Sequence, residues 1–191
     1  SGNVLTINPS SDLDELENYS VRIAATAIDD IAGNSYTGIT DATTLNFTTA
    51  DGTAPIFENS TPNASSVGGT SFTLNTDIDE AGDIFYVVLL DGATAPTSAE
   101  VVSGTGNGGA AAVTSGNATV NSGGFTNAFS VTGLTSETAY DVYVVARDDE
   151  GTPNLQASPT LVNVTTADVT APTIQSSSPA NGATNVNLGQ N

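Results

Sequence analysis

The sequence predicts an all-β protein built from tandem β-sandwiches, and three observations lead to this fold class. Apolar and polar residues alternate with a period of two in several short runs, which is the pattern of half-buried strands. Clusters of Gly, Asn, Asp and Pro separate these runs, as turns do. The phrase Thr48–Pro55 returns in large part as Thr165–Pro172, and flanking residues match in the same register. No stretch has helical periodicity, so we expect no helix.

Composition excludes several classes of function. The chain of 191 residues has no Cys, His, Met or Trp, and only two basic residues stand against 21 acidic ones, which gives a formal net charge of −19. This charge repels phosphate backbones and anionic lipids, so nucleic acid and membrane surfaces are not expected as partners. Catalysis by His or Cys, and zinc sites built on these ligands, are excluded. No apolar run approaches the roughly 20 residues of a membrane span, so direct membrane insertion is not expected.

Residues 1–50 contain strands but not a whole domain. A short β-like run covers residues 4–7, and the alternation over residues 19–27 predicts a half-buried strand. A turn at residues 29–34 precedes a last strand at residues 45–47. These strands cannot bury one another without a further sheet, so we expect something outside these residues to cover them.

Residues 51–168 hold about seven strands, enough for one complete sandwich. The first strand is expected to start at Ile56 and Phe57. The run over residues 84–90 is apolar on both faces, which predicts a central strand. Residues 103–124 are rich in Gly, Ser, Ala and Asn, and we expect weak edge strands there at best. Residues 169–191 begin another unit.

The motif at residues 134–146 reads Leu-Thr-Ser-Glu-Thr-Ala-Tyr-Asp-Val-Tyr-Val-Val-Ala, and it resembles the E–F corner and F strand of fibronectin type III domains. In that family a Leu lies under the corner six residues before a Tyr, whose hydroxyl bonds to backbone upstream. Leu134 and Tyr140 have this spacing. The Trp usual on the family's second strand is missing, and Phe72 is nearest to its place. The resemblance covers residues 51–168.

Both ends of the chain resemble another module, the bacterial Ig-like domain of large surface proteins. The matching stretches are Leu16–Ile23, Asp30–Asn34, Phe47–Thr49, Thr170–Pro172 and Ser178–Val186. The resemblance implies that residues 1–50 are the C-terminal part of one such domain and residues 169–191 the start of the next. Alternating arrays of this kind occur in giant adhesins and multimodular secreted proteins of bacteria, which implies an extracellular or cell-surface location.

The acidic loops are the candidate site. In a fibronectin-like sandwich the B–C and F–G loops lie at the pole where the chain enters, so the resemblance places them beside the entering linker. The candidate metal ligands there are Asp51, Asp77, Asp79, Asp83, Asp148 and Asp149. Oxygen ligands on loops suit calcium (Ca²⁺), which takes six to eight of them. The alternative is an acidic pole that is merely solvated, and both interpretations stay open.

Two further places carry candidate ligands. Asp29 and Asp30 lie in the equivalent loop of the first unit, where the alternative is a tight turn with self-bonding side chains. Asp168 repeats Asp51 at the second junction. We treat these residues as metal candidates on the same footing.

The predicted function is that of a non-catalytic structural or adhesive segment of a large extracellular or cell-surface bacterial protein, an extended stalk stiffened by Ca²⁺. Its partners would be neighbouring repeats of the same chain or adjacent chains, with surface glycans or proteins as further candidates. One alternative is an accessory module of a secreted polysaccharide-degrading enzyme. Another is a subunit of an extracellular filament in which neighbouring chains complete each half-domain. An enzyme is not expected, because the carboxylates lie on loops at a domain pole without an evident cleft.

Overall fold

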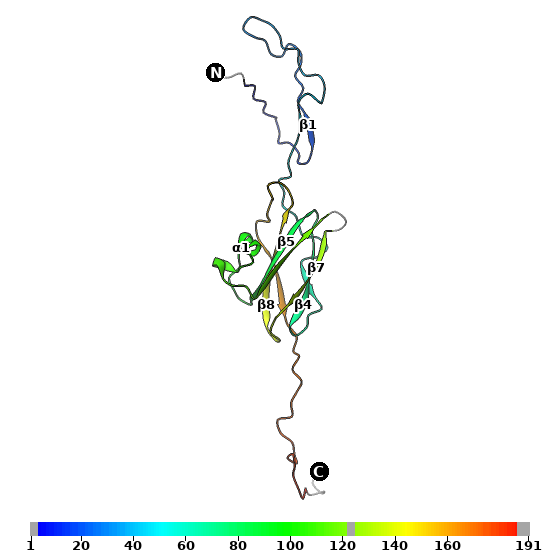
Figure 1. The fold of residues 1–191 in the computed structure, drawn as a ribbon, viewed down its shortest axis with the longest axis vertical. Coiled ribbons are helices and arrows are strands. Elements are labelled where there is room, and N and C mark those ends of the chain that lie inside the picture. Colours follow the sequence, from blue (N-terminus) through cyan, green and yellow to red (C-terminus); the bar gives the residue numbers. More distant parts are fainter. Residues whose placement is uncertain (1–3, 122–124, 187–191) are drawn as a thin grey trace.

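The computed structural model describes residues 4–121 and 125–186, which form an elongated molecule (Figure 1). A small hairpin unit lies at one end, a β-sandwich lies in the middle, and an extended segment leads to the other end. Among the described residues, no helix is both long and apolar enough to cross a membrane.

The sandwich consists of two antiparallel sheets. The first sheet has the order β3-β4-β7, formed by β3 (Asn63–Ser65), β4 (Ser71–Asp77) and β7 (Thr126–Thr132). The second has the order β6-β5-β8-β9, formed by β5 (Gly82–Leu90), β6 (Thr114–Val120), β8 (Ala139–Asp148) and β9 (Thr160–Thr165). The all-β fold class is confirmed, and so is the expectation of about seven strands in this part of the chain. The first of them does not start at Ile56 and Phe57 as predicted, because Phe57 forms only an isolated bridge with Ile78 and β3 begins at Asn63.

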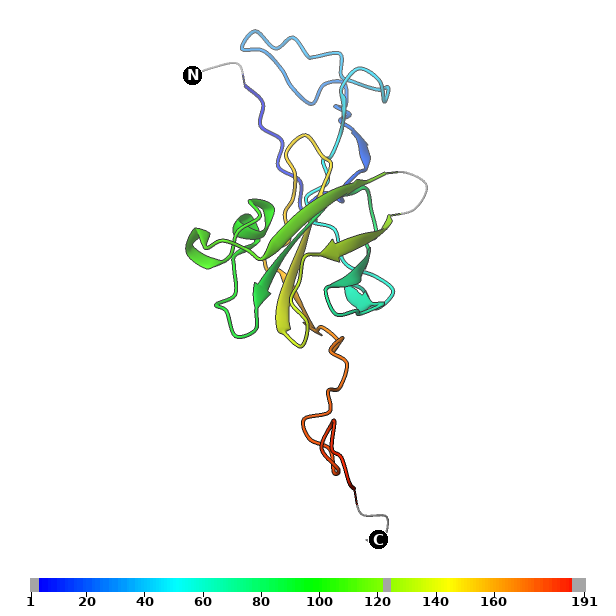
Figure 2. The same cartoon turned by 60° about the horizontal axis from the view of Figure 1, so that its bottom comes forward.

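The core lies between the two sheets because their strands alternate in the expected way. Phe72 and Leu74 of β4 face Ile84 and Val142 of the second sheet, and all of them are buried. The outer face of the second sheet is covered as well, since α1 (Ser98–Val102) packs on it through Val101. Figure 2 shows α1 standing against one side of the sandwich. A central strand that is apolar on both faces therefore finds a partner on each side, as predicted for residues 84–90.

The helix α1 contradicts the expectation that the chain contains none. Its start is a capping box: the Thr97 hydroxyl accepts from the Glu100 N–H at 3.3 Å, and the Glu100 carboxylate accepts from the Thr97 N–H at 2.7 Å. Five residues are too few to produce a visible helical period. Residues 103–124 are also more regular than the weak edge strands that we expected there. They contain a short 3-10 helix, η1 (Asn107–Gly109), and the seven-residue edge strand β6. Residues 122–124 of this stretch lie outside the described residues.

The hairpin unit comprises β1 (Asn18–Ser20) and β2 (Asn46–Thr48), which pair antiparallel. Isolated bridges continue the ladder between Ile23 and Ile39 and between Asp29 and Ser35. The predicted strand at residues 4–7 does not form. Of the strand predicted over residues 19–27, only residues 19 and 20 belong to a regular strand, β1. A strand needs a neighbour to accept its backbone hydrogen bonds, and the described residues pair this unit only with itself.

Candidate functional site

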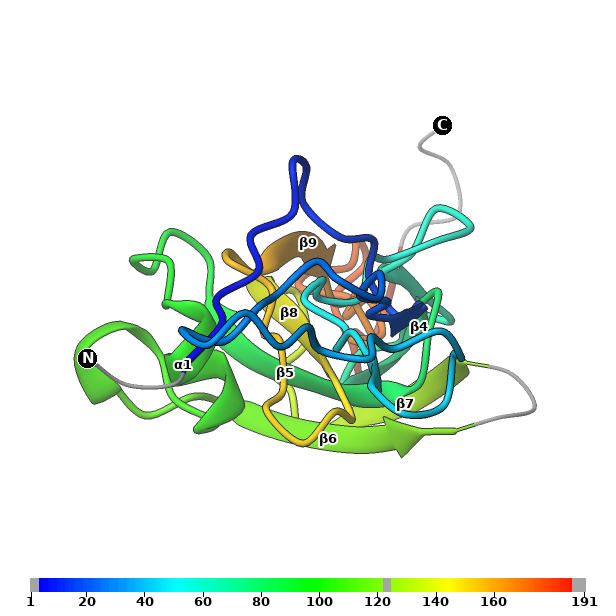
Figure 3. The ribbon, with the colours of Figure 1, turned by 90° about the horizontal axis from the view of Figure 1, so that it is seen from above.

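The entering linker meets two loops of the sandwich at its upper pole, as the resemblance implied. The Ile56 N–H donates to the Asp79 carboxylate at 2.8 Å, and the Asp79 N–H donates to the Ile56 carbonyl at 3.2 Å. The Asn154 amide donates to the Asp51 carbonyl at 3.2 Å, and the Gln156 amide donates to the Pro55 carbonyl at 2.7 Å. The view down the long axis shows the hairpin unit lying over this pole (Figure 3).

Glu80 is the electrostatic centre of the pole. Partial burial and the negative charges of Asp51, Asp79 and Asp148 raise the pKa of the Glu80 carboxyl to about 7, from an ordinary value of 4.5. A hydrogen bond between the carboxyls of Glu80 and Asp51 contributes in the same direction. The structure therefore brings three predicted ligands, Asp51, Asp79 and Asp148, close enough to act on Glu80, which was not among the predicted ligands. The acidic run at residues 77–83 contained the signal, because Glu80 follows directly after Asp79.

These carboxylates are already partly committed to protein hydrogen bonds. The Asp148 carboxylate accepts from the Asn154 N–H at 2.8 Å and from its side-chain amide at 2.7 Å. The Asp51 carboxylate accepts from the Thr53 N–H at 2.9 Å. Within the described residues, no group of three or more acidic side chains is arranged to hold a metal ion. A cation at this pole would therefore need the free oxygens of Asp51, Asp79 and Glu80 to turn toward one point.

Three other predicted ligands of the sandwich have separate roles. Asp83 forms an ion pair with Arg147 at 2.8 Å. Partial burial acts to raise the pKa of Asp83, but the hydrogen bond from the Thr119 hydroxyl and the hydrogen bonds and charge of Arg147 outweigh it, so the pKa is lowered. The Asp77 carboxylate accepts from the Asn59 amide at 2.6 Å. Asp149 lies exposed just after β8 and is not among the charges that act on Glu80. The structure thus separates these three residues from the Glu80 cluster.

The candidates outside the sandwich are bonded within their own turns. The Asp30 carboxylate accepts from the Asn34 N–H and side-chain amide, both at 2.8 Å, and these bonds lower the pKa of Asp30. The Asp29 carboxylate accepts from the Ser35 hydroxyl. The Asp168 carboxylate accepts from the Thr170 N–H at 2.7 Å. These contacts agree with the tight-turn interpretation of residues 29–34.

The linker is also bonded to the hairpin unit. The Thr53 hydroxyl donates to the Glu15 carboxylate at 2.6 Å. Gly52 allows this approach, since a Cβ at that position would lie 2.8 Å from a Glu15 oxygen. The linker is therefore held by polar contacts from both sides. The sequence carried no signal for Glu15, Asn154 or Gln156, because their partners lie up to 103 positions away.

The corner at Tyr140 has the predicted geometry. Tyr140 and Leu134 are buried, and the Tyr140 hydroxyl accepts from the Thr135 N–H at 2.9 Å. The Thr166 hydroxyl at the end of β9 closes the same corner, since it donates to the Thr135 carbonyl at 2.6 Å and accepts from the Thr138 N–H at 3.0 Å. The corner thus fixes how the chain leaves the sandwich.

The same corner occurs again in the hairpin unit, where we had not predicted one. The Tyr19 hydroxyl accepts from the Asp14 N–H at 2.9 Å. The Thr49 hydroxyl donates to the Asp14 carbonyl at 2.6 Å and accepts from the Glu17 N–H at 3.0 Å. The spacing from Leu13 to Tyr19 equals that from Leu134 to Tyr140, so this signal was present in the sequence.

The comparison with protein families gives a match at the N-terminal end of the chain. Residues 1–49 match the family model of the bacterial Ig-like domain. Domains of this family occur in surface or extracellular proteins of bacteria, where they act as structural modules. No curated protein matches the chain.

Proposed function

We propose that this chain is a non-catalytic stalk segment of a larger extracellular or cell-surface bacterial protein, in which the hairpin unit and the sandwich form one stiff rod. The observation that carries the proposal is the bonded linker. Four hydrogen bonds join residues 51–56 to the sandwich, and one joins Thr53 to the hairpin unit. Such contacts restrict the angle between two units, as a stalk that transmits force or holds a distance requires.

The elongated arrangement supports the same role. The chain enters the sandwich at one pole and leaves at the other, so each unit adds length along one axis (Figure 1). The net charge of −19 favours extension too, because like charges along a rod repel. A stalk in which the part outside residues 51–168 consists of bacterial Ig-like domains is consistent with the match at residues 1–49.

We further propose that Ca²⁺ stiffens the junction by binding at Glu80. Burial and the repulsion from Asp51, Asp79 and Asp148 raise the pKa of Glu80, and the repulsion is relieved either by a proton or by a cation shared with Asp51 and Asp79. Carboxylate and carbonyl oxygens are ligands that Ca²⁺ accepts in flexible geometry, whereas Mg²⁺ requires a nearly ideal octahedron. The bound ion would join the linker to the loop after β4.

Thermal unfolding tests the calcium proposal. We expect millimolar Ca²⁺ to raise the melting temperature of the sandwich, because an ion that binds only the folded form stabilises it by mass action. Magnesium at the same concentration should have a smaller effect. The double variant Asp51→Asn/Glu80→Gln should abolish the response. Asp91→Asn/Glu137→Gln, at exposed positions near the opposite pole, is the control with the same charge change.

The two parts of the proposal fail separately. A melting temperature that chelator leaves unchanged, at physiological salt and pH 7.5, would eliminate calcium and leave an acidic pole that is only solvated. The stalk itself would be contradicted by a hairpin unit that moves independently of the sandwich in solution.

A further inference from the structure

The connection between β5 and β6 is much longer than the sandwich requires. These two strands are neighbours in the second sheet, and a hairpin loop of about two to five residues would join them. Residues 91–113 join them instead, in a segment that contains α1 and η1 and that we call the β5–β6 insertion. Segments held on a rigid scaffold are common places for binding sites.

Hydrogen bonds within the β5–β6 insertion hold it in one conformation. The residue that completes the capping box of α1 also fixes η1, since the Gly108 N–H donates to the Glu100 carboxylate at 2.6 Å. The Asn107 amide donates to the Ala95 carbonyl at 3.3 Å. Val101 is 1% exposed and packs on the outer face of the second sheet. The insertion is therefore a fixed wall, and binding against a fixed wall costs little conformational entropy.

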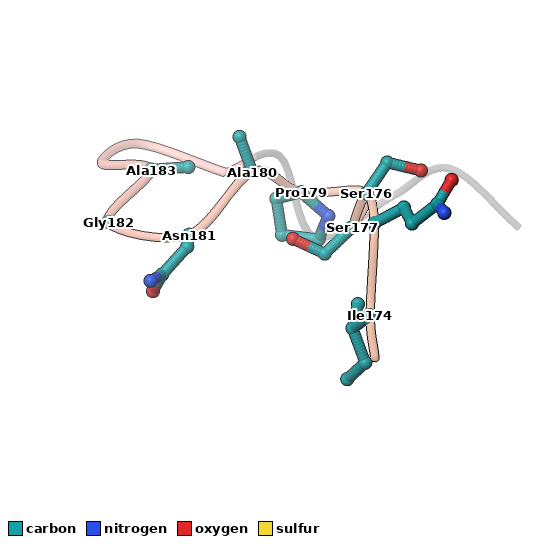
Figure 4. Close-up of a pocket in the computed structure, with 9 residues that line it drawn as sticks. Ile174, Ser176, Ser177, Pro179, Ala180, Asn181, Gly182 and Ala183 are labelled. Atoms are coloured by element: carbon teal, nitrogen blue, oxygen red, sulfur yellow. The ribbon is translucent and has the colours of Figure 1, made fainter. Parts of the chain in front are cut away.

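A cavity of about 190 Å³ lies between this wall and β6. Its lining comes from three parts of the fold: Phe85 of β5, residues 101–104 at the end of α1, and residues 115–117 of β6. At Gly104 φ is +73°, and a Cβ there would lie 2.9 Å from the Ser115 hydroxyl oxygen, so glycine lets the two walls come this close. By contrast, the hollow at residues 174–183 has walls from a single stretch of chain (Figure 4). The cavity beside α1 is enclosed by separate elements, as binding sites are.

The lining of this cavity offers hydrogen-bonding groups without charge. Ser103, Ser115 and Asn117 contribute two hydroxyls and one side-chain amide. The Ser103 hydroxyl donates to the Ala99 carbonyl at 2.9 Å, and its oxygen can still accept. Ser115 and Asn117 are exposed side chains of the edge strand β6, where a ligand can reach them. No acidic or basic side chain is among the described residues that line the cavity.

The Phe85 ring, which lines the cavity on the side of the sheet, is held in one orientation. The Arg147 guanidinium lies over this ring, with its central carbon 5.1 Å from the ring centroid. The Asp83 carboxylate fixes the guanidinium in turn, since it accepts from Nη2 at 2.8 Å and from Nε at 3.2 Å. Because Asp83 and Arg147 neutralise each other, they place no net charge beside the cavity.

These features together fit a neutral sugar ring. Sugar hydroxyls both donate and accept hydrogen bonds, as the hydroxyls and the amide of the lining do. The C–H groups of a sugar ring can pack against an aromatic side chain such as Phe85. The volume lies below the range of about 300–1,000 Å³ that drug-sized ligands occupy, so the cavity suits a single ring. The net charge of −19 disfavours anions, and the lining offers no carboxylate to a cation.

We propose that the cavity between α1 and β6 binds one neutral pyranose ring, which packs on Phe85 and bonds through its hydroxyls to Ser115 and Asn117. The same chemistry recognises a free sugar and the end of a glycan chain. This inference goes beyond the proposed stalk function, because it gives the segment a ligand as well as a length. It does not depend on the junction, since the β5–β6 insertion supplies none of the hydrogen bonds that hold the linker.

Titration of the ¹⁵N-labelled chain with sugars, followed by NMR, tests the proposal. The probes are glucose, galactose, mannose and N-acetylglucosamine, each as the free sugar and as its methyl pyranoside. We expect saturable shifts of the Gly104, Gly116 and Asn117 amide signals, with a Kd of about 1–10 mM for so small a ligand. Equal binding of the methyl pyranoside indicates that the anomeric position is open and that the site takes the end of a glycan chain. Binding of the free sugar alone indicates a free monosaccharide.

Two variants of β6 locate the response in the cavity. Asn117→Ala should weaken binding by about three- to tenfold, the effect of one or two lost hydrogen bonds. Ser115→Leu should abolish binding, because the larger side chain fills the cavity. Asn163→Ala is the matched control, since it removes an exposed amide from the other edge strand of the same sheet and should leave binding unchanged. Far-UV circular dichroism checks that each variant is folded, and Asn117→Ala tests the site if Ser115→Leu unfolds.

Two results would overturn the proposal: no saturable shift with any probe at about 100 mM, or shifts that persist undiminished in Asn117→Ala. Either result leaves the stalk intact, because the stiffness of the junction and the calcium response are measured without sugar. A flexible junction in a chain that still binds sugar would instead reject the stalk and keep the site.

Discussion

Removal of the Tyr140 hydroxyl should destabilise the sandwich by a predictable amount. The ring is buried and its hydroxyl accepts from the Thr135 N–H at 2.9 Å. Tyr140→Phe keeps the ring in place, so the change consists of one lost hydrogen bond and one backbone donor left without its partner. Such a loss costs about 1–2 kcal/mol. For a domain of this size, that corresponds to a decrease of roughly 3–8 °C in melting temperature.

Tyr19→Phe is the matched control for this measurement. Its hydroxyl accepts from the Asp14 N–H at the same distance of 2.9 Å, but the bond lies in an exposed setting. Water can replace the hydroxyl there, so we expect a change of less than about 0.5 kcal/mol. The two variants therefore differ in burial and hardly at all in bond geometry.

Urea unfolding followed by far-UV circular dichroism measures both variants, because the chain contains no Trp for fluorescence. The urea concentration at the midpoint of unfolding should fall for Tyr140→Phe, while the slope of the unfolding free energy against urea concentration should not change. This combination indicates that stability has changed and that the denatured state has not. Equal and small effects of the two variants would refute the reasoning, since the corner would then contribute nothing through burial.

Three further predictions use the same unfolding assay. Thr166→Val should destabilise by about 2 kcal/mol, because the buried hydroxyl closes two backbone hydrogen bonds; a value near zero would contradict this role. Gly82→Ala should cost about 2–4 kcal/mol, since its Cβ would collide with the Arg147 carbonyl on the neighbouring strand. A folded variant with wild-type stability would show that the strands separate easily there. The raised pKa of Glu80, about 7 against 4.5, means that the folded state keeps a proton which the unfolded state releases. This contribution is fully present below pH 4.5 and is lost as pH rises through 7. Because Glu80 is partly exposed, we expect at most about 1 kcal/mol; Glu80→Gln should remove this part of the pH dependence, and an unchanged slope would argue against the cluster.

The sandwich could be predicted from sequence because its signals are local. Period-two alternation indicated the strands that carry Phe72 and Val142, and the run that is apolar on both faces indicated the strand of Ile84. The spacing from Leu134 to Tyr140 indicated the corner. The strand at residues 4–7 was predicted wrongly because a β-like run reports the preference of a segment and not the presence of a partner strand. The helix α1 was missed because its capping box, Thr97 with Glu100, was not considered.

The candidate site could be predicted only in part. The acidic runs and the resemblance placed Asp51, Asp79 and Asp148 at one pole, and all three act on Glu80. The sequence could not tell that Asp83 is neutralised by Arg147, because that pairing depends on the register of β5 and β8. For the same reason, the hydrogen bonds that hold the linker could not be foreseen. Side chains of the sandwich that lie about a hundred positions away in the sequence hold the linker.

The stiffness of the junction is tested most directly by a distance measurement across it. The chain has no native cysteine, so a pair of spin labels can be attached at Thr40→Cys in the hairpin unit and Thr132→Cys at the far pole of the sandwich, both exposed. Double electron–electron resonance should give one narrow distance distribution at neutral pH. The same labels in an Asn154→Ala/Gln156→Ala background should give a broad distribution, because two of the linker's hydrogen bonds are removed. A broad distribution in the otherwise native chain would contradict the stiff rod, since the two units would then move independently.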